Sequence, residues 1–471
     1  MNPKQLSLII ALALGAASMN AGASGYRFGS QSVSAQGTAE SNGAEAADAS
    51  TIFANPAGLS RLEGRQFMGG VTALVPHSTF QDSGSTRFTR TPTGGKTSQD
   101  DYAPEVVAAP SLYYSQKIDD RWTAGVGVFV PYGTKLDYDW NWSGRYALTN
   151  IKLEAVTINP SVSFKVNDQH AFGFGVDAEY MKARLGQGVD VPGSVAAAQA
   201  SGTGAVLARQ ILALGGNPAA LATAGDAHGS VEGKDWGYGF NLGYMYSPTE
   251  STRFGIAYRS SIKHELKGGA IWDFSGVTSD RVVNGVLQNA SHRANSAARV
   301  DLRTPETLSI NAFHQFDEKW AGMADVTWSR TSRMENIDIQ FVGTTEGDET
   351  IRQQWKNTVR VSLGGNYKLN EAVTLRAGIA HDDAPIRSDA LRHAALPDAD
   401  RMQLSFGANW KLTPNSSLDM AYSYLDFKDA NGNYSNNCNP LATTCTGNGE
   451  TTRGTWKTHM QLVGLAYNVK F

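Results

Sequence analysis

Three segments of the chain alternate strictly between two kinds of residue, and this period of two restricts the fold more than any other feature. In the last nine residues the large apolar side chains all fall on one face, and the other face carries small and polar ones; the apolar positions are Val463, Leu465, Tyr467, Val469 and Phe471. Residues 254–259 and 402–412 repeat the pattern. Successive side chains of a strand point to opposite faces. The pattern therefore predicts strands that cross a membrane, with lipid on one side and a lumen on the other.

The sequence also excludes helices that span a membrane. After residue 23, no window of about 18 residues is free of charged and polar breaks, whereas a spanning helix needs about 20 predominantly apolar residues. The 49 Gly, 10 Trp, 17 Tyr and 18 Phe favour one large all-β architecture with many tight turns and aromatic belts.

The first residues form an export signal. Lys4 precedes an apolar run from Leu6 to Ala17, and residues 21–23 supply the small side chains that a signal peptidase accepts. The apolar run is too short for an uncleaved membrane anchor, which is the alternative. We therefore predict a signal peptide at 1–23 and a mature chain that starts near Ser24.

Charge and cysteine content narrow the function classes. The formal charge of −3 becomes −4 when Lys4 leaves with the signal, so the chain has no basic field for nucleic acid. The two cysteines, Cys438 and Cys445, lie close together among Asn, Gly and Thr, which predicts a disulfide-closed loop in an oxidising compartment. The sequence contains no phosphate-binding loop and no cluster of metal ligands, so we predict neither a cofactor nor a bound metal.

Short turns and long polar segments alternate along the chain. Turn signals lie at 119–120, 167–168, 248–250, 317–319, 370–371 and 413–415. Longer connections lie near 81–104, 131–150, 187–232, 267–300, 341–350, 385–399 and 429–452. Membrane barrels alternate short periplasmic turns with long external loops in this way. Six turns and seven loops join 14 strands, so residues 66–471 are predicted to form an all-β, 14-stranded antiparallel transmembrane barrel with both ends on the periplasmic side.

The segment before the barrel has a different pattern. Residues 24–65 show no lipid–lumen alternation, and we predict that they form an N-terminal plug, or hatch, in the lumen. Asp48 is expected to cap a short helix that begins near Ala49, and Pro56 to force Asn55 into an extended conformation that ends it.

Several motifs resemble one family of outer-membrane proteins along the whole mature length. Residues 43–62 read GAEAADASTIFANPAGLSRL, in which Asn55, Pro56 and Ala57 match that family's NPA hatch motif. Further matching stretches are VGVFVPYGTKL at 126–136, SGRYALTNIKLEAVTINPSVSFKVND at 143–168, WGYGFNLGYMYSP at 236–248, FGIAYRSSIKHELKG at 254–268, LRTPETLSINAFHQF at 302–316 and LRAGIAHDDAPI at 375–386. On these motifs the chain resembles the FadL family of long-chain fatty-acid transporters. The resemblance implies a monomeric barrel in the Gram-negative outer membrane, a moving hatch, and exit of hydrophobic solutes through a kink in the third strand.

The third predicted strand contains the residues expected at such a kink. Gly125, Gly127, Pro131 and Gly133 lie where it should end, and glycine and proline mark bulges and interrupted pairing. An outlet through the wall would let a solute enter the bilayer without returning to water. The alternative is a tight bend that leads into the loop.

Two loops contain apolar residues at helical spacing, which predicts amphipathic helices. These residues are Val206, Leu207, Ile211 and Leu214 in one loop, and Val282, Val283, Val286 and Leu287 in the other. Facing each other, the helices would form an apolar groove for capture of the solute, which matches the low-affinity loop site that the resemblance implies. The alternative is that these faces only pack the loops together. A fatty carboxylate would bind a cation, and the candidates by strand position are Arg145, Lys152, Arg259, Arg303, Arg360 and Arg376, with lumen ion-pair networks as the alternative.

The resulting hypothesis is an outer-membrane channel for hydrophobic compounds, most of all long-chain fatty acids, that contacts outer-membrane lipid and works as a monomer. Aromatic hydrocarbons are the alternative ligands. An outer-membrane hydrolase would need a serine, a histidine and an orienting partner, but no GxSxG elbow occurs and histidines such as His170, His264, His314 and His459 are scattered. A general porin would need rings of charge and no plug. A receptor role for the loops is compatible with transport.

Overall fold

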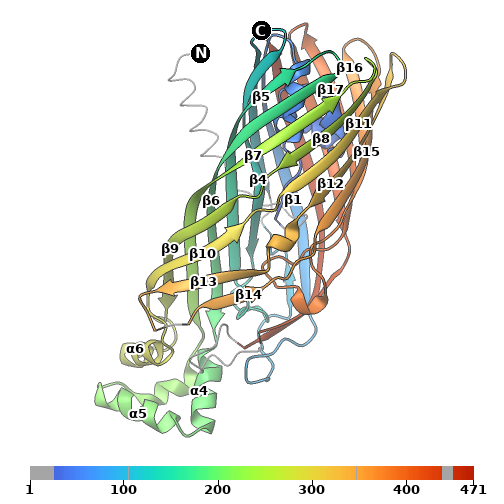
Figure 1. Cartoon of the computed structure of the whole chain (residues 1–471). Coiled ribbons are helices and arrows are strands. Elements are labelled where there is room, and N and C mark those ends of the chain that lie inside the picture. Colours follow the sequence, from blue (N-terminus) through green and yellow to red (C-terminus); the bar gives the residue numbers. More distant parts are fainter. Residues whose placement is uncertain (1–25, 104–105, 346, 437–448) are drawn as a thin grey trace.

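The computed structural model describes residues 26–103, 106–345, 347–436 and 449–471, and these form a closed antiparallel barrel (Figure 1). Its wall has 14 strands. They are β1 (Arg65–Asp82), β3 (Val107–Lys117), β4 (Trp122–Asp137), β5 (Asn150–Lys165), β6 (His170–Val189), β7 (Ala227–Tyr246), β8 (Thr252–Arg259), β11 (Thr307–Gln315), β12 (Trp320–Ser329), β15 (Thr358–Lys368), β16 (Val373–Asp382), β17 (Arg401–Thr413), β18 (Ser416–Phe427) and β20 (Thr451–Lys470). The first and last strands pair continuously from Gln66↔Lys470 to Asp82↔Gly454, which closes the barrel.

Four wall strands continue toward the loops after a break. β9 (Lys263–Asp273), β10 (Ser296–Arg303), β13 (Asn336–Val342) and β14 (Glu349–Arg352) are these continuations. β9 pairs with β7 and β10, and β13 pairs with β10 and β14. Two short strands, β2 (Ser98–Asp100) and β19 (Ala430–Ser435), pair with β1 and β20. The predicted 14-stranded barrel is confirmed.

The lipid-facing and lumen-facing sides follow the predicted alternation. In β20, Val463, Leu465 and Tyr467 are about half exposed, and Ala466 is buried. Phe254 and Ile256 in β8 are likewise exposed, and Ala257 is buried. The exposed apolar face suits lipid, because strands of a membrane barrel place alternate residues in hydrocarbon.

The six predicted turns join wall strands at one end of the barrel. Four of them use the same local hydrogen bonds, in which a side-chain oxygen accepts from the backbone N–H groups two and three residues later: Asp119, Asn167, Asp317 and Asn370. This Asx turn explains why Asp or Asn stands at each of these positions.

The long loops lie at the other end and carry the helices (Figure 1). They contain α4 (Val191–Ala200), α5 (Gly204–Ala213), η3 (Pro218–Thr223) and α6 (Arg281–Ala290), with η4 (Thr331–Arg333) and η5 (Asp389–Leu391) nearby. The loop that contains Val206, Leu207, Ile211 and Leu214 forms two helices, α4 and α5, because the chain turns between them at Gly202, which has a φ of 78°. None of the helices in the described residues is long and apolar enough to cross a membrane.

The residues before β1 form four short turns of helix: α2 (Val33–Gly37), η1 (Asn42–Ala44), α3 (Thr51–Ala54) and η2 (Pro56–Arg61). Asn55 is extended, with φ −159° and ψ 104°, and ends α3 as predicted. The expectation for Asp48 is wrong in detail: the helix starts at Thr51, and Asp48 Oδ1 accepts the Ser50 N–H instead (2.9 Å). The predicted signal peptide, Cys438 and Cys445 lie outside the described residues.

Candidate functional site

The residues from Tyr26 to Gly64, called the N-terminal segment below, lie inside the barrel. α2 contacts β17, β18 and β20, η1 contacts β11 and β12, and η2 contacts β5, β6 and β7. The segment joins the wall at the rim with the short turns, where the Lys117 N–H donates to the Gly64 carbonyl (2.9 Å). The lumen is therefore occupied at its periplasmic end.

The Asn55-Pro56-Ala57 motif anchors this segment to the wall. Asn55 is fully buried; its Oδ1 accepts the Ala57 N–H (3.1 Å) and its Nδ2 donates to the Tyr244 carbonyl (3.2 Å). Three inward-facing glycines, which we call the glycine seat, surround the motif: Gly173, Gly243 and Gly255. A Cβ on Gly173 would lie 2.2 Å from Ala57 N, and one on Gly243 would lie 2.2 Å from Asn55 Oδ1. Only glycine lets the two backbones approach this closely.

Glycines also receive the segment on the opposite wall. A Cβ on Gly378 would lie 2.3 Å from the carbonyl carbon of Thr38, and one on Gly364 would lie 2.7 Å from the Thr38 oxygen. Gly37 and Gly407 meet backbone to backbone. The sequence analysis did not predict these contacts. The only sign of them in the sequence is that glycine occupies inward-facing positions on several neighbouring strands.

Three arginines of the wall, two of them buried and one partly buried, donate hydrogen bonds to backbone carbonyls of the segment. Arg253 Nε donates to the Ala44 carbonyl (2.9 Å), Arg259 Nη2 to the Phe53 carbonyl (3.2 Å), and Arg360 Nη2 to the Ala39 carbonyl (3.0 Å). Arg259 also pairs with Asp177. Burial of these charges is compensated by their partners, as a low-dielectric interior requires.

The structure brings most of the predicted cationic candidates into such networks. Arg376 pairs with Asp419, Arg145 with Asp226, Lys152 with Glu154, and Arg360 with Glu40. Arg303 is exposed, and its backbone carbonyl accepts the Tyr26 hydroxyl (3.1 Å). Ion pairing is thus the main role visible for these residues.

The wall is interrupted between β3 and β4, and we call this interruption the lateral gap. Pairing of the two strands stops at Leu112↔Val128, so residues 107–111 of β3 pair only with β1. On its other side β4 pairs with β5, and the pairing passes from Phe129↔Thr157 to Tyr132↔Ala155. Two residues of β4 therefore lie opposite one residue of β5. This β-bulge bends the strand away from β3.

The N-terminal segment fills the inner side of the lateral gap. The Phe28 N–H donates to the Pro131 carbonyl (2.7 Å), and the Gly133 N–H donates to the Tyr26 carbonyl (2.9 Å). The Gln31 side chain bonds both backbone groups of Val130, at 2.7 and 2.8 Å. The segment therefore satisfies backbone groups of β4 at Val130, Pro131 and Gly133 that the break in the wall leaves without a strand partner.

The four predicted outlet residues divide between two places. Pro131 and Gly133 lie in the lateral gap and contact the segment. Gly125 and Gly127 lie below it, where β4 still pairs with β3 through Ser115 and Tyr113. A Cβ on Gly125 would lie 2.8 Å from Ile52 Cδ1, so this glycine makes room for the segment instead.

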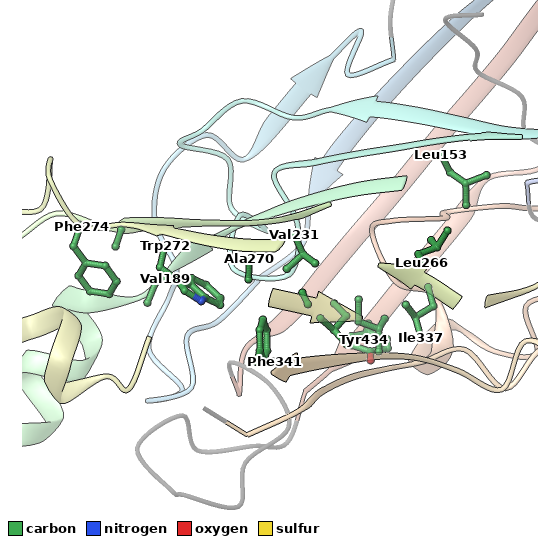
Figure 2. Packing of buried hydrophobic residues seen from close by; sticks show 14 of the residues in the cluster. Leu153, Val189, Val231, Leu266, Ala270, Trp272, Phe274, Ile337, Phe341 and Tyr434 are labelled. Atoms are coloured by element: carbon green, nitrogen blue, oxygen red, sulfur yellow. The ribbon is translucent and has the colours of Figure 1, made fainter. Parts of the chain in front are cut away.

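An apolar cavity lies on the loop side of the segment. It comprises about 620 Å³ of space not filled by atoms, part of which is open to solvent, and Tyr26 is among its lining residues. Its walls are mainly aliphatic; they include Ile151, Leu153, Leu185, Val231, Leu266, Leu302, Met334, Ile337 and Ile339. Apart from Ile151, these residues belong to or pack on one buried cluster that continues toward the loop helices, and Figure 2 shows side chains of this cluster pointing into a shared interior. An apolar lining of this kind is typical of sites for small apolar ligands.

The loop helices pack against the same cluster. Six of the eight predicted groove residues are part of it or pack on it: Leu207, Ile211, Val282, Val283, Val286 and Leu287. Val206 and Leu214 point outward, with 54% and 64% of their surface exposed. The helices α5 and α6 are in contact, so most of the predicted apolar face is used in packing, and two residues remain open to solvent.

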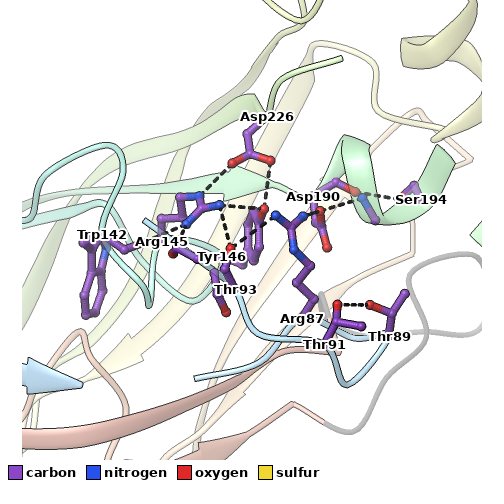
Figure 3. A network of polar contacts seen from close by, with 12 residues as sticks. Arg87, Thr89, Thr91, Thr93, Trp142, Arg145, Tyr146, Asp190, Ser194 and Asp226 are labelled. Atoms are coloured by element: carbon purple, nitrogen blue, oxygen red, sulfur yellow. Dashed lines mark hydrogen bonds and ion pairs between the residues drawn. The ribbon is translucent and has the colours of Figure 1, made fainter. Parts of the chain in front are cut away.

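A polar network, called the loop network below, ties three external loops together (Figure 3). Arg145 Nε lies 2.7 Å from Asp226 Oδ2, and the Tyr146 hydroxyl donates to Asp226 Oδ1 (2.8 Å). Arg87 pairs with Asp190, which also caps α4 by accepting the Gly193 N–H (2.8 Å). Burial raises the pKa of the Asp190 carboxyl, although Arg87 beside it acts in the opposite direction. The network fixes the three loops relative to one another.

Comparison with known proteins identifies the family. Residues 14–471 match the model of the outer membrane protein transport proteins (OMPP1/FadL/TodX). The chain belongs to this family. It is 33% identical over 478 residues to an outer membrane protein of Neisseria meningitidis serogroup B, which covers 99% of this chain and 98% of the relative. It is 26% identical to the long-chain fatty acid transport protein of Escherichia coli K12, over 88% of this chain and 91% of that protein.

Solved structures show the same fold. A FadL homologue from Pseudomonas aeruginosa matches with a TM-score of 0.79 at 24% identity, over 95% of this chain and all of that one. The toluene transporter TodX of Pseudomonas putida matches with a TM-score of 0.63 at 19% identity, over 90% of this chain and 94% of that one. The protein is thus an outer-membrane transporter of hydrophobic compounds with the fold of the FadL/TodX family, and a family of transporters points away from an enzyme.

Proposed function

We propose that this protein takes up long-chain fatty acids across the outer membrane through the apolar cavity and out through the lateral gap. The observation that carries the proposal is the break between β3 and β4, which lies beside the N-terminal segment. The glycine seat and the wall arginines hold this segment across the periplasmic end, so the gap offers a shorter way out of the lumen than the plugged rim.

The energetics favour an apolar solute on this route. Each methylene that moves from water into an apolar site contributes about 0.8 kcal/mol, so a long acyl chain gains several kcal/mol on entering the cavity. Leaving through the wall transfers the chain from one apolar surface to another. A return to water on the periplasmic side would lose the same free energy again.

Residues 24–65 act as the hatch in this proposal. Tyr26, Phe28 and Gln31 bond the backbone of β4 at the gap, so a shift of this short stretch opens the wall without unseating Asn55, Pro56 and Ala57. The exposed residues Val206 and Leu214 provide the first apolar contact on the loops. Each barrel carries its own cavity, gap and hatch, and we propose that it works as a monomer.

The ligand is proposed to be a fatty acid, with aromatic hydrocarbons as the alternative. Support for the fatty acid comes from the relatives named long-chain fatty acid transport proteins, at 26% identity. Support for aromatic hydrocarbons comes from the fold shared with a toluene transporter. The aliphatic lining of the cavity accepts either class.

A reversible lock between the N-terminal segment and β4, at the edge of the gap, tests the route. Arg27 and Tyr132 are backbone partners in an antiparallel bridge, where Cα atoms lie close enough for a disulfide. In cells that lack their own transporter, the Arg27→Cys/Tyr132→Cys variant should lose uptake of labelled oleate under oxidising conditions and regain it with reductant. Toluene uptake, measured in parallel, separates the two ligand classes.

The matched control places the same lock in a continuous part of the wall. Ser78 and Thr458 face each other across β1 and β20, with their hydroxyls 3.2 Å apart. The Ser78→Cys/Thr458→Cys variant should transport oleate whether oxidised or reduced. Equal loss in both variants, or loss in neither, would contradict exit through the gap.

A further inference from the structure

Four cationic side chains form a row on the outer face of the barrel, and we call them the cation row. Lys182, Lys234, Lys267 and Arg299 are exposed and lie on the neighbouring strands β6, β7, β9 and β10. Each is the register partner of the next: Lys182↔Lys234, Lys234↔Lys267 and Lys267↔Arg299. Met181, the neighbour of Lys182 in β6, is fully buried in the lumen cluster. Because side chains alternate along a strand, the row points away from the lumen.

The cation row begins where the lipid-facing band of the wall ends. On β6 and β7 the last outward residues before Lys182 and Lys234 are Tyr180 and Trp236, whose ring centroids lie 5.3 Å apart. Lys182 lies about 12 residues from the periplasmic start of β6 at His170, which is roughly 30 Å along the axis of a barrel with strands tilted by about 40°. The apolar band of a membrane barrel is about 25 Å tall and ends in an aromatic girdle. The row therefore lies at the level of the head groups of the outer leaflet.

The charges of the cation row are only partly balanced by acidic side chains. Lys182 and Lys234 have no ion pair among the described residues. Glu154 is the register partner of Lys182 in β5, but it pairs with Lys152 instead (2.7 Å). Glu265 pairs with both remaining cations of the row, at 2.8 and 3.6 Å. Like charges directly opposite each other on neighbouring strands destabilise a sheet, so the row favours an external anion.

We propose that the cation row binds the phosphoryl groups of a phosphorylated glycolipid in the outer leaflet. Clusters of basic residues at the edge of a membrane-spanning region bind anionic lipid head groups. The exposed aromatic side chains Trp236 and Tyr238 lie next to the row on the membrane side, where the glycolipid places its acyl chains. The acyl chains hold the phosphoryl groups at this level, whereas a free phosphate ion has to leave water to reach it.

The bound lipid joins the strands that carry the loop helices. In the chain, Lys182 and Lys234 lie on either side of α4 and α5, and Lys267 and Arg299 lie on either side of α6 (Figure 1). Phosphoryl oxygens that bridge the row replace repulsion between neighbouring strands with charge-assisted hydrogen bonds. The lipid therefore stabilises the strands from which these loops extend.

Two lipids that differ only in their phosphates test the cation row. Purified full-length protein is titrated with fully phosphorylated lipid A and with the same lipid after removal of its phosphates, and binding is measured by native mass spectrometry. Lys182→Gln/Lys234→Gln should weaken binding of phosphorylated lipid A about thirtyfold, since each cation near a membrane surface contributes about fivefold. Binding of the dephosphorylated lipid should not change. Lys182→Arg/Lys234→Arg keeps both charges and should bind phosphorylated lipid A as the native protein does.

The matched control is Arg121→Gln/Lys319→Gln, which removes the same charge from exposed turns on the periplasmic side. It should leave binding of both lipids unchanged. An equal loss in the control would overturn the proposed site, because net charge alone would then govern binding. No loss in Lys182→Gln/Lys234→Gln, or native protein that binds both lipids equally, would also overturn it. Displacement of lipid A by a similar concentration of inorganic phosphate would do the same, since the row would then recognise the free anion.

Discussion

The two ends of the barrel are held together by different kinds of contact. At the periplasmic end, backbone meets backbone: the N-terminal segment lies on inward glycines, and arginines bind its carbonyls. At the loop end, α5 and α6 pack through aliphatic side chains. Side chains can repack when their neighbours change, whereas two backbones in contact leave no room for even one methyl group. The backbone contacts at the periplasmic end therefore fix the position of the N-terminal segment, whereas the side-chain packing at the loop end tolerates substitutions.

At the loop end, the loop network differs from this packing because its contacts are polar and not aliphatic. Breaking it is expected to have the largest effect on local stability. Arg145 is buried, pairs with Asp226 and donates to the carbonyls of Thr93 and Gly94. Arg145→Met removes these bonds and leaves a partly buried carboxylate unpaired, which should cost about 4 kcal/mol of local stability. Limited proteolysis of the external loops on intact cells measures it. Cleavage as slow as in the native protein would show that apolar packing alone closes this end.

The glycine seat is expected to give the next largest effect. Gly173→Ala places a Cβ 2.2 Å from Ala57 N, so the N-terminal segment must shift, at a cost of about 3 kcal/mol. Trypsin added from the periplasmic side should then cut at Arg61. Gly285→Ala in α6 is the control, because its Cβ would meet no atom within 4 Å, and it should be neutral or slightly stabilising. An equally protected segment in Gly173→Ala would show that the seat is not rigid.

A pH dependence also separates the two ends. Burial raises the pKa of the Glu450 carboxyl, near the loop end, to about 8, and Glu349 acts in the same direction. A raised carboxyl pKa means that the folded state holds the proton more tightly. This stability is complete below the ordinary pKa near 4.5 and is lost as the pH rises toward 8, by at most about 1.4 kcal/mol per pH unit.

Protease resistance of the loops should therefore fall between pH 5 and pH 8 while that of the N-terminal segment changes less, a window set by the raised pKa. Glu450→Gln should flatten the loop profile. A profile that stays steep in this variant would assign the effect to another group.

The contrast between the ends also explains which features the sequence predicts. Alternation in β20 and the Asx residues of the turns are local, and the barrel, its six turns and the helical loops follow from them. The break in β4 falls at the predicted Pro131, since proline and glycine disfavour regular pairing. The glycine seat and the arginine–carbonyl bonds join residues about 120 to 320 positions apart, as in Gly173 with Ala57 and Arg360 with Ala39. No periodicity in one sequence reveals which distant backbone will approach a given glycine.

The smallest expected effect on stability is also the sharpest test of capture on the loops. Val206 and Leu214 are exposed, so replacing both with serine should change stability by less than about 0.5 kcal/mol. If they contact the solute first, uptake of oleate below saturation should fall about threefold, because apolar surface that would be buried on capture is lost. Leu212→Ser on the same helix is the matched control, since Leu212 is 62% exposed but lies outside the predicted groove. An equal loss of oleate uptake in the control would mean that the general hydrophobicity of the loops matters. No loss of uptake in either variant would mean that the solute is captured directly at the apolar cavity and that α5 and α6 serve only for packing.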